Sequence, residues 1–134
     1  MKKVLLDTHS LIWSLTEPKK IPSKTRKLLE NPETRVCFST VSLWEISLKF
    51  SLGKLKLRNL APEDFLQGAL EQNFDKITIS ENDALGFRNV PRHIHSEPFD
   101  RMLIWQAITR ELIFISAESG LDEYAHLGLR WQWD

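Results

Sequence analysis

Four acidic residues stand at places where a folded chain could bring them together. Asp7 directly follows the first short apolar run, and Glu45 lies one turn into the segment after the second. Glu118 lies three residues beyond Ile115, where the last apolar run ends, and Asp100 opens the long helical pattern that leads into that run. If the apolar runs are neighbouring parallel strands, three of these acids lie beyond the same edge of one sheet. Ligands bind at that edge in open α/β sheets.

Carboxylates packed within a few ångströms repel one another and raise one another's pKa unless a cation neutralises them. Clustered hard oxygen ligands suit Mg²⁺, with Mn²⁺ as a substitute. A cation of this kind turns a bound water into a better nucleophile and stabilises the charge that develops on a phosphodiester. The pattern therefore predicts metal-dependent hydrolysis, with Asp7, Glu45, Asp100 and Glu118 as metal-binding and catalytic residues.

Each of these acids also has an ordinary structural interpretation. Asp7 could cap a helix, and Glu45 could close a capping box with Ser42. Asp100 could interact with a helix dipole, and Glu118 could be an exposed loop acid. Taken singly the four positions are weak signals, and the functional interpretation depends on their shared placement after strands.

Other chemistries lack the residues they need. The single cysteine, Cys37, lies inside an apolar strand pattern, and the sequence has no G-x-S-x-G and no glycine-rich phosphate loop. Phosphotransfer enzymes of the haloacid dehalogenase type need a second Asp two residues after the first, where this chain has His9. Zinc is not expected, because the histidines have no helical ligand pair and no cysteine partner: His9, His93, His95 and His126.

The elements that would position the acids alternate along the chain. Short apolar runs predict strands at residues 4–6, 35–39, 76–79 and 112–115, and helical spacing predicts helices within 10–15, 23–30, 42–50, 62–72, 80–87 and 99–110, with a short helical piece at 122–126. Ser23 and Ser80 are placed to cap two of these helices. Strands separated by helices are typical of a mostly parallel, helix-covered sheet, so the fold class is α/β.

The 134 residues predict one domain, residues 1–134, that can bury a full core. The formal net charge is zero, but residues 1–67 carry 12 Lys and Arg against 7 Asp and Glu, whereas residues 68–134 carry 6 against 11. The basic half could face a polyanion or simply be solvated. No apolar stretch approaches the length of about 20 residues that a membrane span needs, so we expect a cytoplasmic protein with no membrane partner.

Four motifs together resemble those of PIN-domain ribonuclease toxins of the VapC type, from type II toxin-antitoxin systems. They are L-L-D-T-H at residues 5–9, S-L-W-E-I-S-L-K at 42–49, H-S-E-P-F-D-R at 95–101 and I-S-A-E at 115–118. The resemblance implies a three-layer α/β/α sandwich with a central, mostly parallel sheet of about four to five strands. It also implies a Mg²⁺ or Mn²⁺ site formed by an acidic quartet, endonucleolytic cleavage of RNA, a homodimer and inhibition by a cognate antitoxin.

On this resemblance Asp7, Glu45 and Asp100 fall on the metal-binding acids of the family. Ser116 falls on the Ser or Thr that precedes the fourth acid. We expect Asp7 and Asp100 to be direct ligands and Glu45 to complete the site or orient the attacking water. Thr8 and Ser116 could donate hydrogen bonds to these carboxylates or to bound water.

The chain departs from the family pattern at two places. The fourth acid is usually Asp, and Glu118 places its carboxylate about 1.5 Å further from the backbone. Asp122 is a weaker substitute for it. Ser96 stands where the subgroup often has a basic residue. The change at Glu118 motivates an alternative function, a PIN-like module with little or no turnover that binds RNA or a partner protein.

Overall fold

The computed structural model describes residues 1–92 and 97–134. Its five strands are all parallel: β1 (Lys3–Leu6), β2 (Arg35–Ser39), β3 (Asp75–Ile77), β4 (Ile113–Ile115) and β5 (Arg130–Gln132). They form one sheet in the order β3-β2-β1-β4-β5. Leu5 at the centre of β1 pairs with Cys37 of β2 on one side and with Phe114 of β4 on the other. The predicted α/β class and mostly parallel sheet are confirmed.

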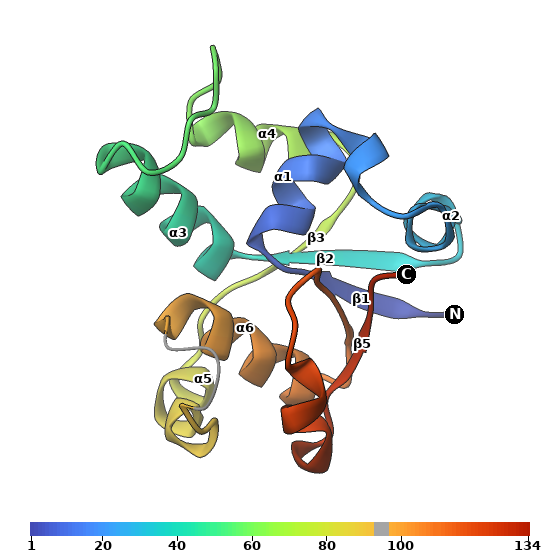
Figure 1. The fold of residues 1–134 in the computed structure, drawn as a ribbon, viewed down its shortest axis with the longest axis vertical. Helices are drawn as coiled ribbons and strands as arrows, with labels where there is room; N and C mark the ends of the chain where they lie inside the picture. The colour runs from blue at the N-terminus through green and yellow to red at the C-terminus, as the bar shows by residue number, and fades with distance from the viewer. Residues whose placement is uncertain (93–96) are drawn as a thin grey trace.

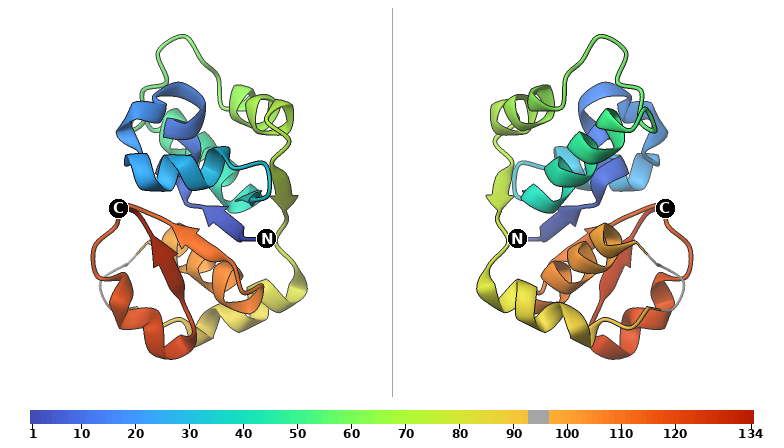
Figure 2. Two further views of the ribbon diagram at one scale, coloured as in Figure 1. Left: turned by 90° about the vertical axis from the view of Figure 1, so that its right-hand side faces the viewer. Right: turned by 90° about the vertical axis from the view of Figure 1, so that its left-hand side faces the viewer.

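Helices connect the strands and cover both faces of the sheet (Figure 1). The α-helices are α1 (Thr8–Thr16), α2 (Ser23–Glu30), α3 (Thr40–Ser51), α4 (Glu63–Glu71), α5 (Glu81–Gly86) and α6 (Pro98–Thr109). Three 3₁₀ helices are η1 (Pro18–Lys20), η2 (Phe87–Asn89) and η3 (Leu121–Leu127). Helices α1, α3 and α4 lie on one face, and α5, α6 and η3 lie on the other (Figure 2). The result is the three-layer sandwich expected from the sequence.

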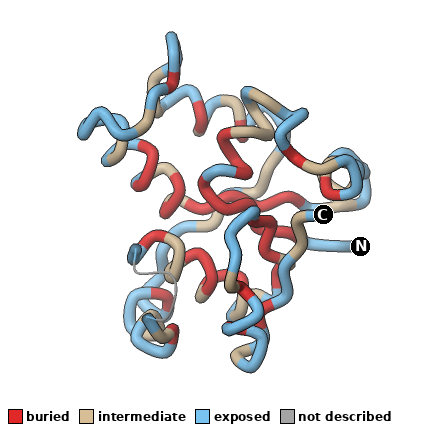
Figure 3. The backbone as a smooth tube through the Cα atoms, viewed as in Figure 1, coloured by how far each residue is buried: buried red, intermediate tan, exposed pale blue. Residues whose placement is uncertain are grey.

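The alternation of side chains along β1 divides the core into two halves. Val4 and Leu6 point toward the α1, α3 and α4 layer, whereas Leu5 points toward α6. All three side chains are fully buried. The buried segments accordingly run through the middle of the molecule, between the two helical layers (Figure 3). A strand buried on both faces reads as a continuous apolar run, which is why β1 was recognisable from its sequence.

A buried polar network joins α5 and α6. Ser80 caps α5 in a capping box with Asp83, as the sequence predicted for this helix start. The Asp83 carboxylate also accepts hydrogen bonds from Arg110 at 2.9 Å and from Gln106 at 3.1 Å. Gln106 in turn accepts a 2.6 Å bond from the Ser39 hydroxyl at the end of β2. Burial raises the pKa of Asp83, but these donors outweigh it and lower the pKa to about 2.

Three local predictions were wrong. Residues 130–132 form a fifth strand that the sequence did not reveal. Helix α2 begins at Ser23 itself, with Pro22 at the cap position, so Ser23 is not the cap. Helix α3 begins at Thr40 with Ser39 as its cap, two residues before the predicted start. Within residues 1–92 and 97–134, no helix is both long and apolar enough to cross a membrane.

Candidate functional site

Asp7 caps helix α1 at the carboxyl end of the central strand. Its carboxylate is 4% exposed and accepts a 2.8 Å hydrogen bond from the backbone N–H of Ser10. Burial raises the pKa of Asp7, and hydrogen bonds from the Ser116 and Ser10 side chains partly offset that rise. Ser116, in the loop after the neighbouring strand β4, is therefore one of the groups that lower the pKa of Asp7.

Glu45 lies on the buried side of α3 and is 2% exposed. The Thr8 hydroxyl donates a 2.6 Å hydrogen bond to Glu45 Oε1, and Lys49 Nζ lies 2.6 Å from Glu45 Oε2. The capping box considered from the sequence does not form, because α3 begins at Thr40 and its cap is Ser39, whose hydroxyl accepts from the Val41 N–H. Glu45 therefore contacts Thr8, the residue that follows Asp7 in the chain.

Asp100 lies in the first turn of α6, as expected. Burial is the largest cause that raises its pKa, followed by the negative charges of Glu45, Glu118, Asp7 and Glu97, and the pKa reaches about 7. The three other predicted acids are thus among the charges that raise this pKa. The four acids occupy one electrostatic neighbourhood because β1 lies between β2 and β4, so the segments that follow these strands meet at one edge.

Glu118 differs from the other acids in its exposure. It lies in the loop after β4, it is exposed to solvent, and its backbone N–H donates a 3.1 Å hydrogen bond to the Ser116 hydroxyl. Its negative charge is one of the causes that raise the pKa of Asp100.

Sequence reasoning missed one acid of this neighbourhood. Glu97 is the cap residue of α6, half-exposed, and its carboxylate lies 3.0 Å from Lys49 Nζ. The only signal in the sequence is that Glu97 directly precedes the Pro-Phe-Asp-Arg segment. Ser96, His93 and His95, on which other sequence expectations fell, lie outside the described residues.

The side chains of the cluster suit a hard divalent cation in their chemistry. They are carboxylates and hydroxyls, the oxygen donors that Mg²⁺ and Mn²⁺ prefer. The raised pKa of Asp100 marks negative charge that a cation would relieve. In the described part of the chain, however, no three carboxylate, imidazole or thiol groups are arranged closely enough to hold a metal ion together. The donor set fits the ion, and the acids would have to draw closer to bind it.

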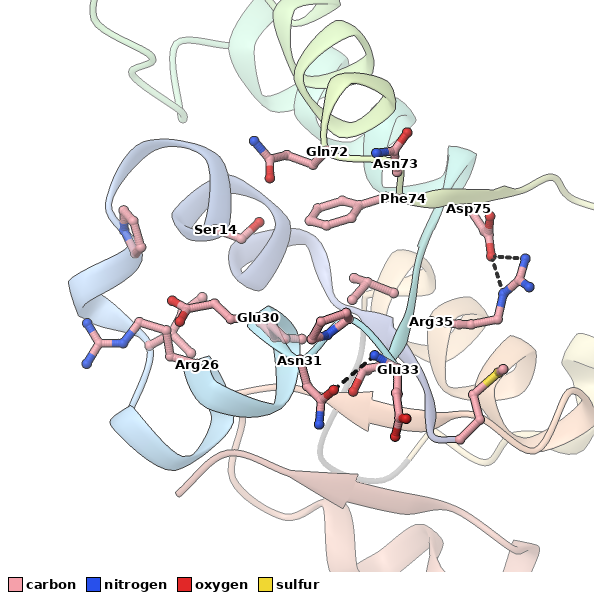
Figure 4. Close-up of a pocket in the computed structure, with 17 residues that line it drawn as sticks. Ser14, Arg26, Glu30, Asn31, Glu33, Arg35, Gln72, Asn73, Phe74 and Asp75 are labelled. Carbon is pink, nitrogen blue, oxygen red and sulfur yellow. Dashed lines mark hydrogen bonds and ion pairs between the residues drawn. The ribbon is translucent and has the colours of Figure 1, made fainter.

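A cavity of about 940 Å³ lies at the opposite, amino-terminal edge of the sheet (Figure 4). Phe74 contributes to its wall, Arg35 and Asp75 form an ion pair of 2.8 Å across the starts of β2 and β3, and Asn31 accepts from the Glu33 N–H. None of the proposed site residues is among the described residues that line it. The cavity therefore lies at one edge of the sheet and the acids lie at the other. We take the acids as the candidate site because their side chains can bind a cation.

The fold is an all-parallel α/β/α sandwich, and its acids gather at the carboxyl edge of the sheet. Comparison of the sequence with known protein families identifies the family. The PIN domain family matches residues 4–127, and the chain belongs to this family. PIN domains are generally nucleases and typically use divalent metals. No curated protein sequence matches the chain significantly.

Solved structures share this fold. VapBC2 from Rickettsia felis bound to a promoter DNA fragment aligns with a TM-score of 0.68 at 14% identity, over 98% of this chain and 99% of that chain. FitAcB from Neisseria gonorrhoeae aligns with a TM-score of 0.57 at 18% identity, over 96% and 95%. A toxin-antitoxin complex from Klebsiella pneumoniae aligns with a TM-score of 0.58 at 17% identity, over 93% and 92%.

Proposed function

We propose that this chain is a Mg²⁺- or Mn²⁺-dependent endoribonuclease toxin that hydrolyses RNA phosphodiester bonds. The observation that carries the proposal is the placement of the acids: the segments after β1, β2 and β4 meet at the carboxyl edge of the sheet, and burial together with four neighbouring carboxylates raises the pKa of Asp100 to about 7. Membership of the PIN family and the hard-oxygen character of the donors support the same reaction class. We place this activity in the cytoplasm.

The residues of the cluster take distinct roles in this proposal. Asp7 and Asp100 are short acids at helix starts and would hold the cation directly, and Glu45 and Glu118 would complete its surroundings. A divalent cation bound there supplies an activated water and stabilises the charge that develops on the scissile phosphate. Thr8 holds the Glu45 carboxylate in place through its 2.6 Å hydrogen bond, and Ser116 holds that of Asp7.

Cleavage of a structured RNA by the purified protein tests this proposal. Reactions contain Mg²⁺, Mn²⁺ or EDTA, and a circular RNA distinguishes endonucleolytic cleavage from trimming of ends. Asp7→Asn keeps the cap of α1, because Asn is an equally good cap residue, but it removes the negative charge. The matched control is Glu63→Gln, which removes the charge of an exposed acid in the first turn of α4.

We expect cleavage by the wild type and by Glu63→Gln, and no cleavage with EDTA or by Asp7→Asn. DNA of the same sequence should remain intact. Glu118→Gln tests the role of the fourth acid: loss of cleavage assigns Glu118 to the site, and unchanged cleavage leaves a site of three acids. A wild type that binds RNA but cuts neither this RNA nor total cellular RNA would favour the binding module instead.

We also propose that a cognate antitoxin protein neutralises the activity. The support is the fold shared with proteins solved as VapBC and toxin-antitoxin complexes. Expression of the wild-type chain alone should arrest cell growth, and expression of Asp7→Asn should not. Co-expression with a small protein encoded beside this gene should restore growth. Arrest by both forms would indicate an effect unrelated to the acid cluster.

We propose, finally, that two copies of the chain associate through α3. Trp44 and Leu48 lie one helical turn apart, and their exposed fractions are 56% and 39%. Trp44 packs edge-on against Phe99 of α6, with ring centroids 4.8 Å apart, so the apolar face continues onto α6. A two-fold axis across this face would bury the same side chains from both copies. Light scattering should show a dimer that Leu48→Asp dissociates, whereas Leu85→Asp, at an exposed position on α5, should leave it intact.

A further inference from the structure

The Lys49 ammonium is held inside the acid cluster. Lys49 lies one turn after Glu45 on α3, and its side chain is 25% exposed. Its Nζ atom lies 2.6 Å from Glu45 Oε2 and 3.0 Å from Glu97 Oε2, so one cation joins α3 to the cap residue of α6. These two contacts direct the ammonium charge at the site.

This contact distinguishes the Glu45 carboxylate from that of Asp100. Both oxygens of Glu45 have a partner, one in Thr8 and the other in Lys49. By contrast, the largest influences on Asp100 from residues 1–92 and 97–134 are its burial and the negative charges of four carboxylates. A divalent cation would thus find Asp100 ready to bind it and Glu45 already engaged.

We propose that Lys49 is a positioning residue that competes with the divalent cation for Glu45 and so sets the cation affinity of the cluster. The inference rests on the proposed metal-dependent function. Glu97 makes the competition reversible, because it holds the ammonium from the other side when Glu45 turns away. Lys49 can then remain paired with Glu97 at the rim of the site while Glu45 joins the cation.

The chemistry of lysine suits this role. An ammonium is a compact point charge on a flexible stem with three donors, so it can lean from one carboxylate to another without a fixed bidentate geometry. It also supplies the positive charge that a buried Glu45 needs before a metal arrives, since a buried charge without a partner is costly. The contact accounts for a cluster whose acids suit a divalent cation but do not converge on a single point.

Mn²⁺ affinity, measured by the electron paramagnetic resonance signal of free Mn²⁺, tests the proposal without any nuclease readout. The proteins compared are the wild type, Lys49→Met, Lys49→Arg and Lys54→Met. Lys54 is exposed in the segment after α3, so its replacement removes the same charge away from the acids. We expect Lys49→Met to bind Mn²⁺ about tenfold more tightly than the wild type, because one nearby positive charge is lost. Lys49→Arg and Lys54→Met should stay within about twofold of the wild type.

Equal or weaker Mn²⁺ binding by a folded Lys49→Met would overturn the proposal, because Lys49 would then only support Glu45. If no variant and no wild type binds Mn²⁺, the proposed metal-dependent function fails together with this inference. A nuclease that binds Mn²⁺ with no difference between wild type and Lys49→Met overturns this inference alone.

A measurement on the wild type keeps the test decisive if Lys49→Met does not fold. The ¹⁵N resonance of the Lys49 ammonium is followed by NMR during a Mg²⁺ titration. Competition for Glu45 requires this resonance to shift and to reach a plateau with the same midpoint as Mg²⁺ binding. A resonance that stays unchanged while Mg²⁺ binds would show that Lys49 does not yield Glu45 to the cation.

Discussion

The replacement of Asp100 by Asn should stabilise the protein at neutral pH when metal is absent. Asp100 is the acid on which the other carboxylates act, and its pKa is raised from 3.8 to about 7. In the unfolded chain the carboxyl group loses its proton near the ordinary value. Between these two pKa values the folded protein holds a proton that the unfolded chain has lost. The free energy of unfolding therefore falls as the pH rises through this interval.

The size of the effect follows from the shift. Each pKa unit corresponds to about 1.4 kcal/mol, so a shift of about three units costs about 4 kcal/mol once the pH exceeds 7. Asp100 is partly exposed, and solvent screening reduces the figure to between about 2 and 4 kcal/mol. The uncharged amide of Asp100→Asn avoids this cost. Below pH 4 both side chains are neutral, and the two proteins should unfold with similar free energies.

Urea unfolding in EDTA at pH 4, 6 and 8 measures this difference, with Asp122→Asn as the control for an exposed acid. We expect Asp100→Asn to exceed the wild type in stability by about 2–4 kcal/mol at pH 8 and to match it at pH 4. Saturating Mg²⁺ should narrow the gap at pH 8, because the cation stabilises the charged wild-type site. A gap that is absent at pH 8, or that is the same at pH 4 and pH 8, would refute the electrostatic account of the cluster.

Three further predictions concern the scaffold. A Cβ at Gly86 would lie 2.5 Å from the Trp105 ring, so Gly86→Ala should lower the free energy of unfolding by about 1–3 kcal/mol, measured by tryptophan fluorescence in urea, and an unchanged midpoint would contradict the close packing. Arg110→Met leaves the Asp83 carboxylate without its cation and should cost about 3 kcal/mol at pH 7. Because the pKa of Asp83 is lowered to about 2, this loss should shrink as the pH falls from 4 toward 2, and a pH-independent loss would argue against the ion pair. Burial raises the pKa of the Cys37 thiol, so this thiol should react with a disulfide reagent only in denaturant, and fast reaction in the native state would contradict its position in the core.

The sequence predicted β3 at one edge of the sheet and the strands that are buried on both faces, but it missed β5 at the other edge. Continuous apolar runs identified β1, β2 and β4, since a core strand needs apolar side chains on both faces. β5 has three residues, of which Arg130 and Trp131 are exposed, and its backbone pairs with β4 through Arg130, Trp131 and Gln132. Such a strand forms because a neighbouring edge offers hydrogen bonds, and no pattern in its own residues records that.

The candidate site was predictable as a set of residues but not as an arrangement. The acids could be named because they follow strands, and their meeting depends on β1 lying between β2 and β4, which is a property of the whole fold. A spacing of four residues on one helix favours the ion pair between Lys49 and Glu45. The contact of Lys49 with Glu97 has no such local signal, because it joins two helices whose packing no local pattern specifies.

The central position of β1 also affects when the acids can meet during synthesis. The Asp7 N–H donates to the Ile115 carbonyl oxygen, and the Ser10 hydroxyl donates to the same oxygen across 105 positions. Chains emerge from the ribosome N-terminus first. The side of β1 that pairs with β4 therefore stays unpaired until β4 has been translated. Glu118 follows later still. In a nascent chain the cluster therefore stays incomplete, and the four acids can meet only after β4 and the loop that follows it have been translated.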